Sequence, residues 1–309
     1  MITALCLNPC IDRTVEIAEF AYGGMNRILS SREDGSGKGV NVAIVTAKLG
    51  MRSQCVGFMY ESNGHVITQR LEREGALGRF VHLPGAVRTN LKILDRSRGV
   101  ITEVNESGAQ VSVEQIEELT RLTLEYARAS DYLVLTGSAP PGCPPGIYRD
   151  LIAALGGSGC RCVLDAEGEK LTLGITGAPY MVKPNQYELE LAVGRKLNSV
   201  TEIRDAALRF IEKGVALVVV SMGGEGALIT DGEQSLYAPG MKIPVRSTVG
   251  AGDSMVSGIL HGLTEGCELA ETFRRGVACA SASVMTEGTQ LVDAAQYRAL
   301  LSGVEMRRV

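Results

Sequence analysis

The run Leu217-Val218-Val219-Val220 decides the fold class, because four consecutive residues carry apolar side chains. Successive side chains of a strand point to opposite faces, so this run predicts a strand that is covered on both faces, as in a parallel sheet. Runs of the same kind recur along the chain. They predict buried strands at residues 2–7, 54–58, 132–136, 161–165, 180–183 and 217–221.

Segments with apolar residues at helical spacing alternate with these runs. They predict helices at residues 40–49, 66–74, 113–129, 147–155, 186–193 and 200–213. Ser112 with Gln115, and Ser199 with Glu202, have the spacing of a capping box at two of the helix starts. The alternation predicts an α/β fold with a doubly wound, mostly parallel sheet flanked by helices.

Two stretches interrupt this alternation with pairs of short strands. Residues 14–17 and 28–32 flank one glycine turn, and residues 89–95 and 100–105 flank another. We predict that the two hairpins form a small β-sheet lid, from about residues 12–32 and 88–106, on a single domain spanning residues 1–309. Such a lid would exclude water from a bound ligand. Two hairpins at the edge of the main sheet are the alternative.

The composition is ordinary for a globular protein and excludes several classes. The 309 residues carry a net charge of −4, which does not indicate a nucleic-acid partner. No apolar run approaches the ~18 residues of a membrane span, and the first residues lack the basic segment of a signal peptide. The eight cysteines are scattered, with no histidine cluster to complete a zinc site. We expect a cytoplasmic protein with reduced cysteines that binds neither nucleic acid nor membrane.

The stretch Ser247-Thr248-Val249-Gly250-Ala251-Gly252-Asp253-Ser254 carries the chemistry. Its three small residues allow a backbone turn to approach a ligand at the predicted start of an apolar helix. Backbone N–H groups at a helix N-terminus bind anionic oxygens, and Asp253 beside them could take a proton from an attacking hydroxyl. An anion cradle with an adjacent base is what phosphoryl transfer to an alcohol requires.

A glycine-rich loop, Asp34-Gly35-Ser36-Gly37-Lys38-Gly39, precedes the first predicted helix. It is not a P-loop, because Gly39 follows Lys38 where Ser or Thr is required. Its N–H groups, Lys38 and Asn41 could hold the hydroxyls and charge of a substrate; a flexible connection with Asn41 near a cap is the alternative. Asp12, after the first strand, lies where open α/β sheets bind ligands, although a simple turn would also place an aspartate there.

Two arginines, Arg27 and Arg88, fall at the margins of the predicted lid. A guanidinium fork matches a phosphate group, although isolated arginines on a lid are often only solvated. Ser138, in the loop Thr136-Gly137-Ser138-Ala139-Pro140 after another strand, could present its hydroxyl to a ligand. A rigid turn is an equal alternative there.

Two further motifs follow later strands. Asn185 and Glu188, in Lys183-Pro184-Asn185-x-x-Glu188, stand three residues apart at a helix start, where their oxygens could hold a hydrated Mg²⁺. A capping box has the same spacing. The glycines of Ser221-x-Gly223-x-x-Gly226 allow the backbone to approach a nucleotide closely.

In this order, the motifs resemble the phosphofructokinase B branch of the ribokinase-like carbohydrate kinases over nearly the whole chain. The resemblance implies a ribokinase-like core with a β lid, a requirement for ATP and Mg²⁺, and Asp253 as the base beside an anion hole of Gly250, Ala251 and Gly252. It implies that a sugar phosphate is bound by Asp12, Arg27, Gly37, Lys38, Asn41, Arg88 and Ser138. It implies that the nucleotide is bound by Lys183, Asn185, Ser221, Gly223, Gly226 and Thr248, with Asn185 and Glu188 holding Mg²⁺ through water.

Within this branch, the segment Arg88-Thr89-Asn90-Leu91-Lys92 and residues 247–255 look most like the 1-phosphofructokinases. The resemblance therefore implies transfer of a phosphoryl group from ATP to the 6-hydroxyl of fructose 1-phosphate. The positive charge of Arg27, Arg88 and Lys38 favours a phosphorylated acceptor, and tagatose 6-phosphate and fructose 6-phosphate are the alternatives. One departure is Ser36, where the family usually carries a second glycine.

The sequence argues against two other classes of function. A non-catalytic sugar or nucleotide sensor would lack the base or the metal motif, and both are present. A dinucleotide-dependent oxidoreductase needs G-x-G-x-x-G after the first strand, where residues 8–13 read Asn-Pro-Cys-Ile-Asp-Arg. An apolar lid face could pair with a second lid, so a homodimer through the lid is one expectation.

Overall fold

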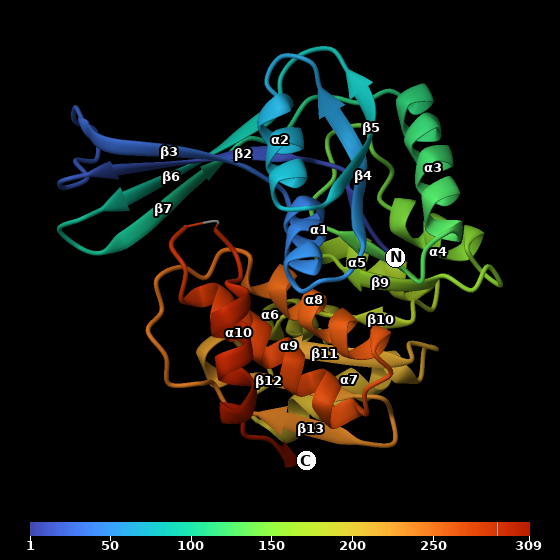
Figure 1. Ribbon diagram of the computed structural model, residues 1–309. Coiled ribbons are helices and arrows are strands. Elements are labelled where there is room, and N and C mark those ends of the chain that lie inside the picture. Colours follow the sequence, from blue (N-terminus) through green and yellow to red (C-terminus); the bar gives the residue numbers. More distant parts are fainter. Residues whose placement is uncertain (289) are drawn as a thin grey trace.

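The predicted apolar runs form the middle of the larger of two sheets in the computed structural model, which describes residues 1–288 and 290–309 (Figure 1). Within these residues, this main sheet has the strand order β14-β13-β12-β11-β10-β9-β8-β1-β4-β5. Its strands are β1 (Ile2–Cys6), β4 (Ser53–Tyr60), β5 (Leu77–Leu83), β8 (Tyr132–Thr136), β9 (Arg161–Asp165), β10 (Met181–Val182), β11 (Leu217–Ser221), β12 (Ala227–Thr230), β13 (Ser235–Ala238) and β14 (Arg307–Arg308). Strands β11 to β5 are parallel, and β12, β13 and β14 continue the sheet antiparallel.

Helices cover both faces of the main sheet, which explains why its central strands are apolar throughout. One layer contains α1 (Lys38–Lys48), α2 (His65–Arg73), α8 (Ala251–Thr264), α9 (Leu269–Val284) and α10 (Ala294–Leu300). The other contains α3 (Val113–Arg128), α4 (Ile147–Ala154), α5 (Gly168–Ile175), α6 (Gln186–Val193) and α7 (Val200–Ile211). The prediction of a doubly wound α/β fold is confirmed. No helix of the described residues is long and apolar enough to cross a membrane.

The predicted capping boxes have different outcomes. Ser112 and Gln115 form both hydrogen bonds of the box at the start of α3. Ser199 caps α7 by accepting from the amide of Glu202, but the Glu202 carboxylate accepts from the amide of Asn198, one residue before the cap. The second predicted box is therefore only half formed, because Glu202 bonds to the amide of the residue before the N-cap and not to the amide of the N-cap itself.

Several elements that the sequence did not predict lack a strong periodic signal. Strand β5 is an edge strand with several exposed residues, and β14 has only two residues. Helix α9 is rich in alanine and serine, so its buried face carries small side chains rather than a clear apolar stripe. It packs closely along α8. Small edge strands and helices of small residues are the parts that pattern reading misses.

The two predicted hairpins form a separate small sheet with the order β3-β2-β6-β7, made of β2 (Cys10–Ile17), β3 (Ile28–Ser36), β6 (Arg88–Asp95) and β7 (Val100–Asn105). The parallel pairing of β2 with β6 joins the two hairpins. The alternative of two hairpins at the edge of the main sheet is therefore wrong. Figure 1 shows the small sheet projecting from one side of the main body.

The carboxyl ends of the parallel strands gather the predicted motifs at one edge of the main sheet. Strands β4 and β5 extend the sheet on one side of β1, and β8 to β11 extend it on the other. The strand order therefore reverses direction at β1. Ligands of open α/β sheets bind at the carboxyl ends of the strands beside such a change of direction. Thr136 and Ser221 end their strands there, and Lys183 directly follows β10.

Candidate active site

Asp253 lies in the first turn of α8, where the predicted glycine turn meets the helix. Gly250 is the N-cap and has a left-handed backbone with φ of 76°, which glycine adopts without strain. Asp253 is buried, and its Oδ2 accepts a hydrogen bond of 2.9 Å from Nδ2 of Asn41 in α1. Because α8 packs on α1, this contact joins two motifs that are far apart in the sequence.

The surroundings of Asp253 raise its pKa to about 6. Burial is the main cause, because it penalises the charged carboxylate, and the negative charge of Asp165 acts in the same direction. Lys38, the hydrogen bond from Asn41, and Lys183 act in the opposite direction. A carboxyl group with a pKa near 6 is ionised at neutral pH yet accepts a proton readily, which suits a general base.

Asp253 stands three residues after the N-cap Gly250, in the helical turn that carries the first backbone amides of α8. Among the described residues, no side chain caps this helix end, so no side-chain acceptor competes for its first N–H groups, which are the kind of donors that bind anions. The amide of Ala251 is engaged, since it donates to the carbonyl of Thr248 at 3.3 Å. A Cβ on Gly252 would lie 3.3 Å from Nζ of Lys183, so this ammonium packs directly on the turn.

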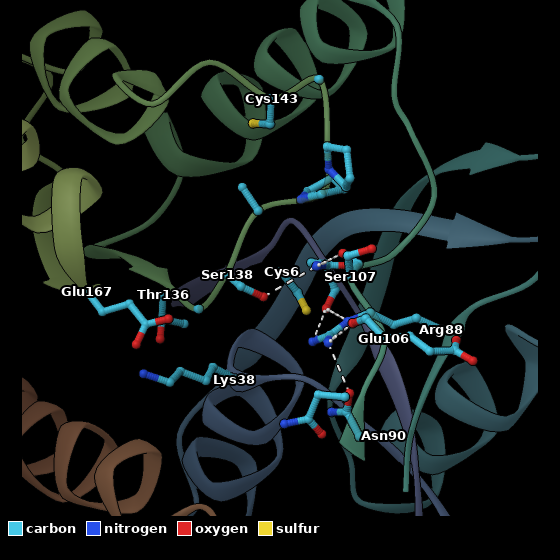
Figure 2. A pocket seen from close by; sticks show the side chains of 17 residues that line it. Cys6, Lys38, Arg88, Asn90, Glu106, Ser107, Thr136, Ser138, Cys143 and Glu167 are labelled. Atoms are coloured by element: carbon cyan, nitrogen blue, oxygen red, sulfur yellow. Dashed lines mark hydrogen bonds between the residues drawn. The ribbon is translucent and has the colours of Figure 1, made fainter. Parts of the chain in front are cut away.

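A cavity of about 610 Å³, here called the small-sheet cavity, lies between the small sheet and the carboxyl ends of β1 and β8 (Figure 2). Figure 2 shows Lys38 reaching into it from α1 and Arg88 from β6 on the other side. Polar side chains make up much of the remaining wall, namely Asn8, Asn90, Asn105, Glu106, Ser107, Thr136, Ser138 and Glu167. Cations on two sides suit a polar ligand that carries an anionic group.

Arg88 is held at the cavity wall by main-chain and side-chain acceptors. Its Nη1 donates to the carbonyl of Glu106 at 2.8 Å and to Oδ1 of Asn90 at 3.0 Å. Its Nε and Nη2 donate to the carbonyl of Asn8 at 3.4 and 3.3 Å. Asn8 also contacts Ser138, because its Nδ2 donates to Oγ of Ser138 at 3.3 Å. Both predicted residues therefore belong to one cavity.

Asp12 is not a turn residue, because it lies within β2 and is buried. Its Oδ2 accepts a 2.9 Å hydrogen bond from Nζ of Lys92, and its Oδ1 accepts one of 3.1 Å from Nδ2 of Asn90. Asn90 lines the small-sheet cavity, so Asp12 is one contact away from it. Sequence reasoning missed Lys92 and Asn90 as site residues, although Arg88, Asn90 and Lys92 alternate as side chains on one face of a strand do.

Gly37 and Lys38 begin α1 against the end of β1. Gly37 is the N-cap with φ of 130°, and a Cβ there would lie 2.8 Å from Sγ of Cys6. Only glycine allows the helix to begin this close to the strand. Ser36, where a second glycine was expected, ends β3 and is buried. The ammonium of Lys38 lies 3.7 Å from Oδ2 of Asp165.

A second cavity of about 350 Å³, here called the glycine-loop cavity, lies beside the Gly250–Asp253 turn at the start of α8. The predicted residues Asn185, Ser221, Gly223, Gly226 and Thr248 line it together with Ala251 and Gly252. The rest of its wall is largely apolar and includes Pro239, Met241, Ile243, Val245, Met255, Val277 and Val284. Sequence reasoning missed these apolar residues, because they come from an irregular segment and two helices without a motif. An apolar slot bordered by glycines suits a planar ring.

Asn185 and Glu188 form a capping box at the start of α6. Asn185 Oδ1 accepts from the amide of Glu188, and Glu188 Oε2 accepts from the amide of Asn185, each at 2.8 Å. Among the residues that the structure describes, no three His, Cys, Asp or Glu side chains gather as a metal cage. Mg²⁺ keeps several waters and needs only one or two carboxylates beside phosphate oxygens. These two residues therefore fit a hydrated ion and not an all-protein cage.

Arg27 is separated from the other predicted residues. It precedes Ile28, which pairs with Ile17 at the far end of the β2–β3 hairpin, whereas Cys10 pairs with Ser36 at the end near the cavity. At ~3.3 Å per residue, these two ends are about 23 Å apart. Arg27 is exposed and does not line the small-sheet cavity of its own chain, because the length of the hairpin carries it away.

Comparison with known proteins decides the family. The model of the pfkB family carbohydrate kinases matches residues 4–295. The chain belongs to this family. It is 34% identical to the 1-phosphofructokinase of Rhodobacter capsulatus over 99% of this chain and 97% of that protein. It is 33% identical to the 1-phosphofructokinase of Escherichia coli K12 over 99% and 98%. The crystal structure of phosphofructokinase-2 from Escherichia coli in complex with substrates and products matches with a TM-score of 0.93 and 30% identity, covering 98% of this chain and 99% of that one.

Membership of the pfkB family makes this chain a carbohydrate kinase, a phosphotransferase that acts on a sugar hydroxyl. The resemblance inferred from the sequence motifs is confirmed, and ATP follows as the expected phosphoryl donor. Asp165 is a further buried residue of the site that the sequence did not predict. Asp165 contacts Lys38 and Lys183, and its signal in the sequence was a carboxylate at the end of a predicted strand.

Proposed function

We propose that this pfkB-family kinase transfers the γ-phosphoryl group of ATP to the 6-hydroxyl of fructose 1-phosphate, giving fructose 1,6-bisphosphate and ADP. Relatives named 1-phosphofructokinase, at 31–34% identity over nearly the full chain, support this acceptor. Tagatose 6-phosphate and fructose 6-phosphate are the alternatives, since they differ in one stereocentre or in the end that carries phosphate.

The position of Asp253 between the two cavities carries the proposal. Ala251 and Gly252, in the same helical turn, line the glycine-loop cavity. Asn41, which donates to Asp253, belongs to the helix whose first residue, Lys38, lines the small-sheet cavity. A sugar in one cavity and a nucleotide in the other would meet at this carboxylate.

Each part of the site then has a chemical role. Asp253 accepts the proton of the 6-hydroxyl as that oxygen attacks phosphorus, which generates the nucleophile without a free alkoxide. The amides of Gly250 and Gly252 stabilise the charge on the transferred group, with Lys183 beside them. In the small-sheet cavity, Arg88, Lys38 and Ser138 bind the sugar phosphate. Gly37 and Asn41 would contribute from the start of α1, and Asp12 through Asn90.

The glycine-loop cavity is the proposed nucleotide site, with Ser221, Gly223, Gly226 and Thr248 at its wall. Charge neutralisation on the β- and γ-phosphates is the chemistry that a hydrated Mg²⁺ would supply. Asn185 and Glu188 would hold its waters. Burial raises the pKa of Glu188, and a nearby cation would favour its ionised form.

We also propose that the small sheet acts as the lid and pairs with the small sheet of a second copy. Its strands and turns expose large apolar side chains, among them Tyr22 at 97%, Met25 at 81%, and Val100 and Val104 at more than half. Exposed apolar patches of this kind mark association surfaces. Sedimentation tests this pairing. A wild-type dimer that becomes a monomer in the variant Val100→Glu/Val104→Glu supports it, and a wild-type monomer contradicts it.

The eight free cysteines fit a reducing compartment such as the proposed cytoplasm.

A coupled ADP-release assay tests the acceptor. The panel contains fructose 1-phosphate, tagatose 6-phosphate, fructose 6-phosphate, fructose and ribose, each with ATP and Mg²⁺. We expect the highest kcat/KM for fructose 1-phosphate, with unphosphorylated sugars far below it. A higher kcat/KM for another phosphorylated sugar would replace the acceptor, and ADP release that is independent of every acceptor would contradict the kinase assignment of the site.

A further inference from the structure

Asp165 holds two lysines that reach the site from different sides. Its Oδ1 lies 3.1 Å from Nζ of Lys183, and its Oδ2 lies 3.7 Å from Nζ of Lys38. Thr136 completes the contacts by donating its hydroxyl to Oδ2 at 3.2 Å. The Asp165 side chain is 1% exposed. One buried carboxylate therefore fixes two ammonium groups that belong to α1 and to the segment after β10.

Lys38 lines one of the two cavities, and Lys183 contacts a residue that lines the other. Lys38 lines the small-sheet cavity, and Figure 2 shows its side chain extending toward the end of that cavity where Thr136 and Glu167 lie. Lys183 packs on Gly252, which lines the glycine-loop cavity. Asp165 itself lines neither cavity. Its contacts thus connect the two sides without direct access to a ligand.

Stability of the fold does not account for this cluster. Charges that are buried lose their hydration, and their mutual attraction seldom gains more than an apolar replacement would. The charged forms of Asp165 and Lys38 are nevertheless favoured. Burial opposes ionisation of Asp165, but Lys183, Lys38 and the Thr136 hydroxyl together lower its pKa. Asp165 in turn is the main cause of the raised pKa of Lys38.

We propose that Asp165 is a positioning residue, which sets the spacing of Lys38 and Lys183 so that their charges flank the phosphoryl group as it passes between the cavities. This inference rests on the proposed phosphoryl transfer. Catalytic charges are effective when their positions are fixed before the reaction, because no reorganisation is then needed. A carboxylate that binds both lysines provides this fixed geometry, and the carboxylate of Asp253 remains free to act as the base.

The test measures kcat and both KM values of Asp165→Asn with ATP and fructose 1-phosphate. The substitution keeps the shape and removes the charge that holds the lysines. We expect kcat to fall roughly 100-fold, the usual effect of a misplacement of about 1 Å. The KM for ATP should stay within about threefold, and the KM for fructose 1-phosphate, which Lys38 also binds, should rise less than about tenfold. In a Lys38→Met background, the further loss from Asp165→Asn should shrink to roughly tenfold or less, because one of the two lysines is already absent.

Asp231→Asn is the matched control. This carboxylate accepts from the amides of Glu233 and Gln234 in the turn between β12 and β13, at the end of these strands away from the site. The control should keep kcat within about twofold, even if its melting temperature falls. A folded Asp165→Asn that keeps wild-type kcat, or losses that multiply fully with Lys38→Met, would overturn the inference.

A second variant decides the matter if Asp165→Asn does not fold. Asp165→Asn/Lys183→Met removes one buried ammonium together with the carboxylate. Compared with Lys183→Met alone, it should lose about another tenfold in kcat, because Lys38 then loses its anchor; equal turnover would overturn the inference. Inactivity of the wild-type chain toward every acceptor would instead refute the proposed function, so the two failures are distinguishable.

Discussion

The small-sheet cavity and the glycine-loop cavity meet at the same helical turn but are built from different materials. Charged and amide side chains from five separate segments make the first, including Lys38, Arg88 and Asn90. The glycine-loop cavity is made by the exposed backbone of several glycines and by an apolar wall. One side therefore depends on which side chains are present, and the other depends on where side chains are absent. Substitutions on the two sides should act on different substrates.

Arg88→Ala gives the largest expected change in substrate binding. Loss of a charged hydrogen-bonding group costs about 1.5–3 kcal/mol, so the KM for fructose 1-phosphate should rise roughly 10- to 100-fold, with the KM for ATP unchanged. Steady-state kinetics with each substrate varied in turn provides the measurement. Arg88→Lys is the matched variant: it keeps the charge but loses the fork, and an intermediate KM is expected. A change confined to the KM for ATP would reverse the assignment of the two sides.

Gly226→Ala tests the glycine-loop side. Gly226 has φ of 108°, and an added Cβ would lie 2.0 Å from the carbonyl oxygen of Ala238. The backbone must shift, so we expect the KM for ATP to rise roughly tenfold and unfolding to cost about 1–3 kcal/mol less. Gly224→Ala is the comparison variant: Gly224 lines the same cavity, but its Cβ would meet no protein atom within 4 Å, so it adds a methyl group without forcing the backbone to move. Equal behaviour of the two variants would show that close backbone approach is unimportant there.

The pH dependence of kcat reports on Asp253, the proposed base between the two cavities. Because the pKa of Asp253 is raised from 3.8 to about 6, the ionised base is lost as pH falls through about 6, and kcat should then drop about tenfold per pH unit. The measurement uses kcat at saturating substrates, since the sugar phosphate itself ionises near pH 6. A profile that stays flat down to pH 5 would remove Asp253 as the base.

Asp253→Asn should also change stability, by a smaller amount. A carboxyl group whose folded pKa is raised destabilises the native state as pH rises from about 4 to about 6, and the shift from 3.8 to about 6 corresponds to about 3 kcal/mol. At pH 8, the asparagine variant should melt about 3–6 °C above the wild type, while near pH 3 the two should melt together. Calorimetry at both pH values provides the check, and a lower melting temperature of the variant at pH 8 would contradict the burial argument.

The sequence predicted the centre of the fold better than its margins, for a physical reason. Strands such as β8 and β11 are covered on both faces, so their apolar runs predict them directly, whereas β5 and β14 lie at edges and lack that signal. The same holds for the site. The Gly250–Asp253 turn is local and could be read from neighbouring residues.

Contacts between distant segments could not be read in this way. Asp12 with Lys92 and Asp165 with Lys38 depend on which strands become neighbours. Spacing alone also left Asn185 and Glu188 open between a metal site and a cap, because both use residues three apart; the structure shows the cap. Arg27 shows a further limit, since its charge suggested a phosphate site while the length of the hairpin places it far from the small-sheet cavity of its own chain.

Turnover of Asp253→Asn with ATP and fructose 1-phosphate tests most directly whether this carboxylate is the base between the two cavities. The variant keeps an oxygen that can accept from Asn41 but cannot take a proton from the substrate. We predict that kcat falls roughly 10²- to 10⁴-fold while both substrates still bind with KM values close to those of the wild type. A folded variant that retains kcat within tenfold of the wild type would contradict the proposed mechanism.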